Sequence, residues 1–296
     1  MSAPMTAHPT ANLISAVPTL FDDKGAVDVG ATRAAYEQLA EAPLDGVFVA
    51  GTTGEFTTLT DEERLAVCAV AGAAFGPERT YCHVGAASTH QAARLVEAAV
   101  DQGARRLAAL TPYYFPATES ALLDYYETVV ARAAGVPVYG YLFAARTTTA
   151  VSPELLARLA DTGLAGVKIS GEDTATVGRY LAALDKRDLP VYSGADAEFT
   201  EVVEIGGTGV VSGVSSALPA PFLAVRDALR SGDPAALAVA RERAHRAVAA
   251  TRQGNLAHLK AVLELRGVPA SGLRAPLDPI SPADRHALEA DVADLL

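Results

Sequence analysis

Gly163-Leu-Ala-Gly-Val-Lys-Ile-Ser170 predicts a short buried strand with one lysine in its middle, and the rest of the chain is organised around it. Side chains alternate along a strand, so Val167 and Ile169 share one face while Lys168 lies on the other, between small residues. The sequence contains four lysines, and Lys168 alone interrupts an apolar strand. The others lie in charged or mixed segments: Lys24, Lys186 and Lys260.

A buried lysine has two interpretations. Removal from water favours the neutral amine, and a neutral amine attacks a carbonyl carbon to give a Schiff base, which acts as an electron sink. Alternatively, the side chain of Lys168 reaches water at the strand end or pairs with a carboxylate. The strand alone leaves both interpretations open, so the rest of the chain has to decide.

On both sides of this strand, short β-rich segments alternate eight times with longer helical segments. Most of the β-rich segments are nearly continuous apolar runs, which are typical of parallel strands covered on both faces. The predicted strands are 13–20, 46–51, 81–86, 106–112, 137–143, 163–170, 190–195 and 208–213. The predicted helices are 29–42, 60–75, 88–103, 118–134, 153–162, 173–186, 196–205 and 219–231.

Several helix starts are explicit. Thr60-Asp-Glu-Glu63 is a capping box, and Ser152-Pro153 and Asp233-Pro234 each place a capping residue before a first-turn proline. The alternation predicts an α/β fold, a closed (β/α)8 TIM barrel over residues 11–232. A doubly wound sheet is the rival, but eight consecutive parallel strands of similar length close naturally.

The remaining residues, 233–296, predict a C-terminal helical extension with helices at 234–253, 255–267 and 282–295. No linker suggests a second independent domain, so the extension is expected to pack on the barrel wall. Residues 1–10 are expected to form a loose tail.

Composition restricts the class of partner. With 24 basic and 35 acidic residues the net charge is −11, which argues against nucleic acid or an anionic membrane as a partner. Cys68 and Cys82 fall in apolar patterns and suggest reduced core thiols in a cytoplasmic protein. No apolar run reaches the ~18 residues of a membrane span, and the N-terminus lacks a basic region followed by an apolar stretch.

In a barrel of this kind, chemistry collects at the carboxyl ends of the strands. There the sequence places Gly51-Thr-Thr-Gly-Glu55, Thr111-Pro-Tyr-Tyr114, Tyr141 with Arg146, Lys168, Ser193-Gly-Ala-Asp196 and Val211-Ser-Gly213. The first of these segments could cradle a carboxylate with its hydroxyls and backbone N–H groups, or be an ordinary glycine-rich turn. Tyr141 could relay a proton or be a core tyrosine, and Arg146 could clamp a carboxylate or be a solvated loop residue.

A metal site is not expected. None of the six histidines shows close ligand spacing, and His83 alone could point into the barrel, which disfavours a metal-dependent aldolase. The glycine-rich segment 206–209 precedes a strand, so it falls at the face opposite the chemistry.

Together these residues resemble the dihydrodipicolinate synthase/N-acetylneuraminate lyase family of class I, pyruvate-dependent aldolases. The resemblance runs from about residue 15 to 282, and its markers occur in order and at family spacing. They are Gly51-Thr-Thr-Gly-Glu55, Thr111-Pro-Tyr-Tyr114, Tyr141, Gly166-Val-Lys168 and Ser193-Gly194.

The resemblance implies a role for each site residue. Lys168 would form the Schiff base with a 2-oxo acid such as pyruvate, and Tyr141 would relay protons. Thr52 would link Tyr141 to Tyr114, which in this family reaches the neighbouring subunit's site. The substrate would be bound by Thr53, Arg146, Gly194 and the Val211 carbonyl. No cofactor is implied, and the family implies a homotetramer, a dimer of dimers.

The aldehyde partner is less defined. Arg146 favours an enzyme like 4-hydroxy-tetrahydrodipicolinate synthase, yet the family pattern Tyr-Asn-x-Pro-x-Arg reads Tyr141-Leu-Phe-Ala-Ala-Arg146 here. Tyr113-Tyr-Phe-Pro116 resembles 2-keto-3-deoxy-sugar-acid aldolases or dehydratases instead. A third alternative is a non-catalytic barrel that binds a 2-oxo acid. Ala87 and Gln91 replace the Asn and Glu of the family's lysine-feedback site, so no inhibition by lysine is expected.

Overall fold

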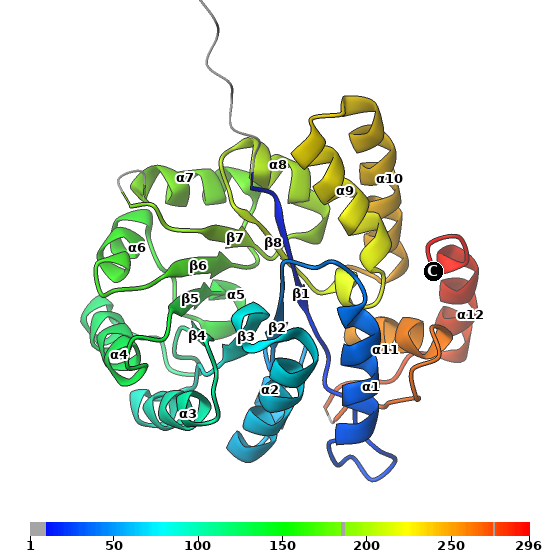
Figure 1. The fold of residues 1–296 in the computed structure, drawn as a ribbon. Coiled ribbons are helices and arrows are strands. Elements are labelled where there is room, and N and C mark those ends of the chain that lie inside the picture. Colours follow the sequence, from blue (N-terminus) through cyan, green and yellow to red (C-terminus); the bar gives the residue numbers. More distant parts are fainter. Residues whose placement is uncertain (1–9, 185–186, 275) are drawn as a thin grey trace, which may run out of the picture.

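The structure, a computed structural model, describes residues 10–184, 187–274 and 276–296. Lys186, most of the predicted tail and the end of the predicted helix 173–186 therefore lie outside the described residues. Eight parallel strands form a closed barrel in sequential order, which confirms the TIM barrel over the doubly wound sheet (Figure 1). The strands are β1 Asn12–Ala16, β2 Gly46–Val49, β3 Thr80–His83, β4 Arg106–Leu110, β5 Val138–Leu142, β6 Gly166–Ile169, β7 Val191–Ser193 and β8 Gly209–Ser212.

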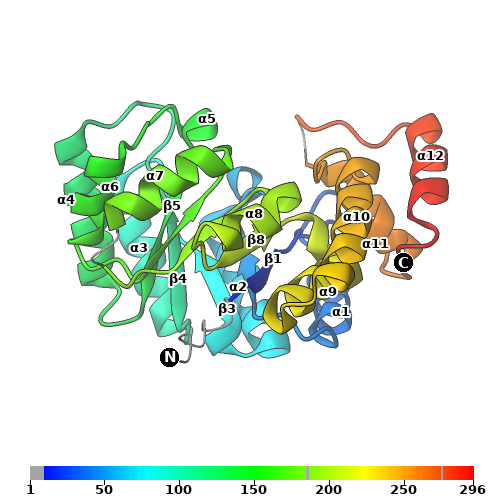
Figure 2. The same ribbon diagram turned by 90° about the horizontal axis from the view of Figure 1, so that it is seen from above.

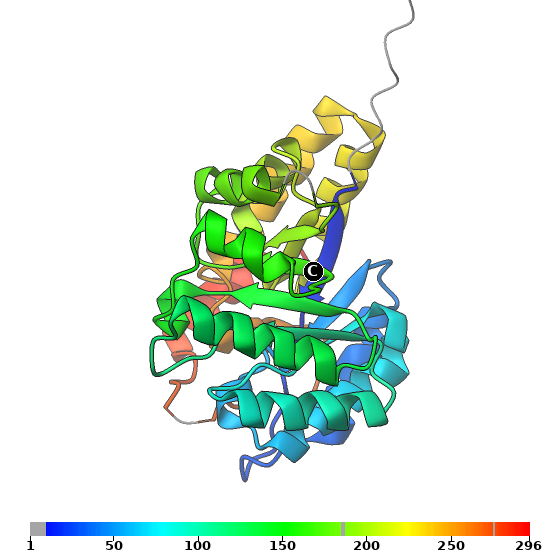
Figure 3. The same cartoon turned by 90° about the vertical axis from the view of Figure 1, so that its left-hand side faces the viewer.

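Helices cover the outside of this barrel. Figure 3, viewed from the side of α3, α4 and α6, shows them as a layer over the strands. The helices of the barrel are α1 Val29–Ala40, α2 Asp61–Phe75, α3 Thr89–Asp101, α4 Glu119–Arg132, α5 Ala144–Thr147, α6 Pro153–Ala160, α7 Thr174–Leu184, α8 Phe199–Glu204 and α9 Pro219–Ser231. Short 3-10 turns lie at Phe56–Thr58, Pro77–Arg79, Asp196–Glu198 and Val214–Ser216.

The predicted helix starts are confirmed. Thr60 and Glu63 form both hydrogen bonds of the capping box at the start of α2. The side chains of Ser152 and Asp233 accept hydrogen bonds from backbone N–H groups at the starts of α6 and α10. These caps satisfy N–H groups that have no partner inside their helices.

Most predicted strands extend a few residues beyond the observed ones, and three elements differ more clearly from the prediction. The first strand ends at Ala16 rather than at residue 20, because Pro18 has no N–H to continue a ladder. The predicted helix 196–205 is a 3-10 turn followed by α8. The short helix α5 was not predicted, and it carries Arg146.

Two apolar clusters hold the barrel together. The larger one lies between the strands and the surrounding helices. The smaller one fills the barrel interior and includes Phe48, Tyr139, Tyr141 and Tyr192. At the amino-terminal end of the strands, the Arg106 guanidinium donates to the Tyr81 and Tyr139 hydroxyls and closes the interior. The barrel interior is therefore packed at the amino-terminal ends of the strands, and it can open to solvent only at their carboxyl ends.

The C-terminal extension contains α10 Pro234–Ala250, α11 Leu256–Leu265 and α12 Pro282–Val292. Figure 2 shows these helices gathered at one side of the barrel, with α12 outermost. Helix α10 packs against α9, and α12 packs against both α10 and α11. Among the residues described, no helix combines the length and apolar character needed to cross a membrane.

Candidate active site

A cavity of about 720 Å³ opens at the carboxyl ends of the barrel strands. Seven of the eight predicted site residues line it: Thr52, Thr53, Tyr141, Arg146, Lys168, Gly194 and Val211. They come from the ends of five different strands or the loops that follow, so the closure of the barrel brings them together.

Lys168 lies at the bottom of this cavity with 6% of its surface exposed. Its Nζ atom is 4.2 Å from the ring centroid of Phe48 and 4.2 Å from that of Tyr141. Strand register places Lys168 directly beside Tyr141 on the neighbouring strand. In the described part of the chain, Lys168 has no salt bridge to a carboxylate, so the paired alternative is not what the structure shows.

Tyr141 and Thr52 are connected. The Tyr141 hydroxyl and Thr52 Oγ1 are 3.1 Å apart and can exchange donor and acceptor roles. Phe48 presents its ring at 77° to the Tyr141 ring, at a centroid distance of 5.6 Å, and fixes its plane. The arrangement gives a phenol, hydrogen bonded to a second hydroxyl, beside the lysine amine.

The loop after β2 adopts a tight turn that directs Thr52 and Thr53 to the cavity. A Cβ atom at Gly54 would lie 3.1 Å from the Ala50 backbone and 3.3 Å from the Val17 carbonyl, so the turn needs a glycine there. Glu55 ends the turn in the left-handed region with a φ of 56°. This loop therefore has little freedom to change shape without moving both threonines.

Tyr114 does not reach this cavity within the chain. It is 79% exposed, has a φ of 77°, and its ring lies edge-on to that of Phe115 at a centroid distance of 4.9 Å. The predicted link from Thr52 to Tyr114 is therefore not made by one chain alone.

Arg146 projects from α5, and its guanidinium lies 5.9 Å from the centroid of the Phe143 ring. None of the described carboxylates forms a salt bridge with it. Hydrogen bonds of Thr147 fix this loop. Thr147 Oγ1 accepts a hydrogen bond from the Thr111 hydroxyl and donates one to the Phe143 carbonyl, both at 3.1 Å. Arg146 is thus held at the cavity wall with its charge available to an anion.

Asp196 also lines the cavity, although the sequence pattern alone assigns it no role. Its carboxylate accepts from the Ser212 hydroxyl and from the Val214 N–H at 3.3 Å. Burial raises the pKa of Asp196, while these hydrogen bonds and the nearby Lys168 charge partly oppose that shift. Its signal in the sequence was its position at the end of a strand beside Gly194.

The C-terminal extension supplies a wall of the cavity, which the sequence did not predict. Arg252, Asn255 and Leu277 line it although they are far from the strand ends in sequence. The sequence places Lys260 in a charged or mixed segment, but the structure buries it and pairs its Nζ with Glu55 Oε1 at 2.7 Å.

His83 points into the barrel, as the sequence allowed, but it is structural. Its Nδ1 atom lies 2.8 Å from the Ala50 carbonyl, and its Nε2 atom accepts from the Leu110 N–H at 3.3 Å. Burial and the Arg64 charge lower the pKa of His83 well below its ordinary value, so the ring is neutral. Across the described residues, no group of three His, Cys, Asp or Glu side chains is arranged to hold a metal ion.

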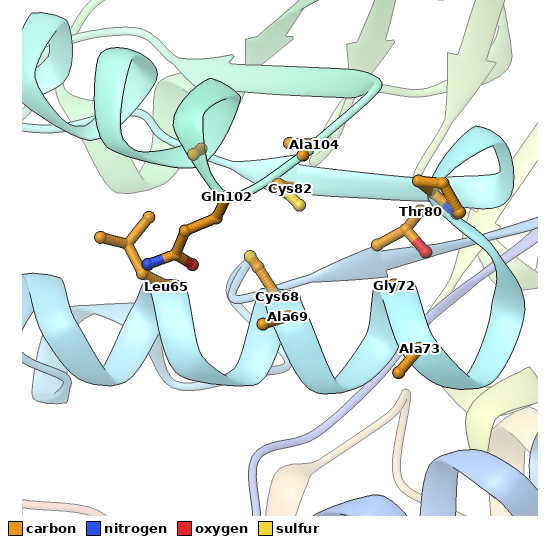
Figure 4. A pocket seen from close by; sticks show the side chains of 12 residues that line it. Leu65, Cys68, Ala69, Gly72, Ala73, Thr80, Cys82, Gln102 and Ala104 are labelled. Carbon is orange, nitrogen blue, oxygen red and sulfur yellow. The ribbon is translucent and has the colours of Figure 1, made fainter.

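A second cavity, of about 240 Å³, lies between α2, β3 and the end of α3. Figure 4 shows the sulfur atoms of Cys68 and Cys82 facing this space among small apolar side chains. Both cysteines are buried free thiols. No charged side chain lines this cavity, so it lacks a group to bind a carboxylate substrate. The cavity at the strand ends is therefore the better candidate for the active site.

Comparison with known proteins agrees with this geometry. The chain matches the Dihydrodipicolinate synthetase family over residues 9–295. It is 35% identical over 286 residues to an uncharacterized DapA-like lyase of Halobacterium salinarum, covering 96% of this chain and 93% of that protein. It is 34% identical over 297 residues to the 4-hydroxy-tetrahydrodipicolinate synthase of Kineococcus radiotolerans, covering 99% and 95% of the two chains.

Among solved structures, the fold is similar to that of YagE, a prophage protein of the dihydrodipicolinic acid synthase family from E. coli K12, solved in complex with pyruvate. The TM-score is 0.89 at 25% identity, and the likeness covers 96% of this chain and 98% of that one. These relatives are lyases by name or family and cover nearly the whole chain. The protein is therefore a member of the dihydrodipicolinate synthetase family.

Proposed function

We propose that this protein is a class I, pyruvate-dependent lyase or aldolase whose Lys168 forms a Schiff base with a 2-oxo acid. The position of the Lys168 amine carries the proposal. It is buried at the bottom of a cavity, 4.2 Å from each of two aromatic ring centroids, and no carboxylate of the described residues forms a salt bridge with it. Such an amine, once neutral, is free to attack a carbonyl carbon.

In the proposed reaction the Lys168 amine attacks C2 of pyruvate to give a carbinolamine. Tyr141 protonates the departing oxygen, so water leaves and an imine forms. The imine draws electrons from C3, which loses a proton, and the resulting enamine attacks an aldehyde carbon. Hydrolysis of the new imine frees the product and the lysine, and the reverse sequence cleaves a 4-hydroxy-2-oxo acid to pyruvate. Because the lysine supplies the electron sink, the reaction needs no cofactor.

The neighbouring groups have roles that fit their positions. Thr52, 3.1 Å from the Tyr141 hydroxyl, passes the proton onward to Tyr114 of a neighbouring subunit. Thr53 and the backbone N–H groups of its loop hold the pyruvate carboxylate, while Gly194 and the Val211 carbonyl line the pocket. A hydroxyl pair of this kind can return the same proton after the imine has formed.

For the aldehyde partner, we favour an activity like that of 4-hydroxy-tetrahydrodipicolinate synthase, with aspartate semialdehyde as second substrate. Arg146 lines the cavity, and its guanidinium can bind a substrate carboxylate through two hydrogen bonds. The Kineococcus relative carries that synthase name at 34% identity.

A 2-keto-3-deoxy-sugar-acid aldolase or dehydratase is the second candidate, and Asp196 is the observation that favours it. A carboxylate facing the cavity accepts hydrogen bonds from the hydroxyls of a polyhydroxy aldehyde. The cavity volume of about 720 Å³ also leaves room for a substrate longer than pyruvate plus a small aldehyde.

Borohydride reduction in the presence of pyruvate tests the Schiff base. The expected result is a covalent adduct by intact mass, mapped to Lys168 and missing in Lys168→Ala, which also loses turnover. A non-catalytic 2-oxo-acid-binding barrel need not gain this adduct, and full activity of Lys168→Ala would refute the proposal. A coupled assay with aspartate semialdehyde, glyceraldehyde and N-acetylmannosamine then identifies the aldehyde.

We also propose a homotetramer built as a dimer of dimers, located in the cytoplasm. The exposed pair Tyr114 and Phe115 supports an intersubunit contact, since large aromatic side chains at the surface mark interaction sites. The free thiols of Cys68 and Cys82 support a reducing compartment.

A further inference from the structure

A second buried lysine lies behind the proposed active site. Lys260 on α11 has 4% of its surface exposed. Its Nζ atom donates to Glu55 Oε1 at 2.7 Å and to the Gly272 carbonyl at 2.8 Å, and it lies 4.4 Å from the centroid of the Phe21 ring. Burial lowers the pKa of Lys260, and the Glu55 carboxylate opposes that shift. None of these contacts has a role in the chemistry described above.

Glu55 is the last residue of the loop that carries Thr52 and Thr53. Its φ of 56° lies in the region that favours glycine, so its surroundings have to hold it there. The C-terminal extension does so at both carboxylate oxygens. Oε1 accepts from Lys260, and Oε2 accepts from the Arg274 backbone N–H at 3.1 Å.

Arg274 ties the same segment of the extension to the residues that follow the loop. Its guanidinium donates to the Glu63 carboxylate at 2.6 and 2.7 Å and to the Thr58 carbonyl at 2.7 Å. The extension therefore binds the chain at Glu55, just before the turn Phe56–Thr58, and again at Thr58, the last residue of the turn, and at Glu63 in α2.

Inside the loop, backbone hydrogen bonds connect Glu55 to the site. The Glu55 N–H donates to the Thr52 carbonyl at 3.1 Å, and the Phe56 N–H donates to the Gly51 carbonyl at 3.2 Å. Thr52 in turn meets the Tyr141 hydroxyl. A shift of Glu55 therefore moves Thr52 away from Tyr141, and a misplacement of about 1 Å is enough to cost roughly 100-fold in rate.

We infer that Lys260 is a positioning residue: its ion pair with Glu55 fixes the loop 51–55 so that Thr52 and Thr53 face Lys168. The C-terminal extension then helps to position the site residues, in addition to packing on the barrel wall. The catalytic consequence rests on the function proposed above, whereas the effect on the loop does not.

Two variants separate positioning from folding. Lys260→Met removes the ammonium and leaves Glu55 buried without its partner. The double variant Glu55→Gln, Lys260→Met leaves no buried charge, and such replacements of buried pairs are often tolerated by the fold. Arg285→Met is the matched control. Arg285 lies on α12 and forms a 2.8 Å ion pair with Glu264, which is on the same helix as Lys260, α11, but away from the cavity.

Two measurements are made on each folded variant: amide hydrogen exchange of residues 51–58, and the rate of borohydride trapping with pyruvate. We expect both Lys260 variants to exchange the backbone amides of residues 55 and 56 at least tenfold faster than wild type and to trap pyruvate at least tenfold more slowly. Arg285→Met should leave both rates unchanged.

The outcomes are distinct. If a folded Lys260 variant keeps both rates within twofold of wild type, or if both variants fail to fold, the pair stabilises the barrel and does not position the loop. If wild type itself traps no pyruvate, the proposed function fails, and the exchange rates still decide whether Lys260 holds the loop.

Discussion

Lys168 and Lys260 are both buried, and their surroundings separate two uses of one side chain. Lys260 meets a carboxylate, a carbonyl and a ring, so its ammonium is satisfied as a cation. Lys168 meets two rings and faces a cavity, with no salt bridge in the described residues. Burial alone therefore does not predict a reactive lysine; the proposal for Lys168 rests on the cavity beside its nitrogen and on the lack of a salt-bridge partner among the described residues.

The Tyr141 hydroxyl can be tested with a single substitution. Tyr141→Phe keeps the ring that packs on Phe48 but removes the hydroxyl 3.1 Å from Thr52. Imine formation should remain possible but slow, with kcat reduced about 100- to 10,000-fold, the usual range for one general acid–base group. Stopped-flow trapping with borohydride would check this, and an unchanged trapping rate would show that the phenol relays no proton.

The response to lysine gives the second prediction. The Gln91 amide donates to Asp61 at 2.8 Å, and nearby the buried Arg64 guanidinium donates to the His83 and Gly85 carbonyls. Ala87 and Gln91 offer a lysine ligand no carboxylate, and the Gln91 amide already binds the nearby Asp61 carboxylate. Activity should therefore be unchanged by millimolar lysine, and strong inhibition in a dose series would refute this.

At the scale of the element, β6 depends on Gly166. Gly166, one of the small residues beside Lys168, leaves room for Tyr139, because a Cβ atom there would lie 2.5 Å from the Tyr139 ring and 3.0 Å from the Pro190 carbonyl. Gly166→Ala should overpack the interior and lower the free energy of unfolding by about 1–3 kcal/mol. Thermal unfolding would measure it, with Gly72→Ala on α2, where a Cβ meets nothing within 4 Å, as the control.

Helix α2 shows how pH acts on one element. The Arg274 guanidinium holds the pKa of Glu63, a half-buried residue in the first turn of α2, below its usual value of 4.5. The folded carboxyl releases its proton more readily than the unfolded one, so the pair stabilises the fold above that value and the benefit is lost as pH falls through the lowered pKa. The melting temperature of Glu63→Gln should therefore lie below that of wild type at pH 7 and approach it near pH 3. A constant difference across that range would contradict the account.

Elements whose signal is local could be predicted from the sequence. The strands are apolar runs and several helix starts carry capping residues. The order of the elements, and from it the closed barrel, could therefore be predicted. Helix α5 could not be predicted, because its four residues Ala144–Thr147 gave no periodicity and depend on Thr111 for a hydrogen bond. Lys260 looked ordinary for the same reason: its partner Glu55 is 205 residues away in sequence. Contacts between distant segments have no local signature unless a family pattern supplies one.

At the scale of the whole molecule, a single chain lacks one part of the proposed site. Tyr114 is 79% exposed, and its backbone has an unfavourable φ of 77°. Backbone strain of this kind persists where the surroundings hold it, and it clusters at functional sites. If Tyr114 completes the site of a neighbouring subunit, a dimer contains two sites, each with Lys168 from one chain and Tyr114 from the other.

This arrangement predicts complementation between two inactive variants. Lys168→Ala and Tyr114→Ala should each lose nearly all activity as pure proteins. In a mixed dimer, the Tyr114→Ala subunit keeps Lys168 and receives Tyr114 from its Lys168→Ala partner, so one of the two sites is complete. Random assembly of equal amounts makes half of the dimers mixed, so the co-expressed pair should regain about one quarter of wild-type activity by two-fold symmetry. Separately purified variants mixed without subunit exchange are the control. If co-expression restores nothing while mixed dimers are present by mass, Tyr114 does not act across a subunit boundary.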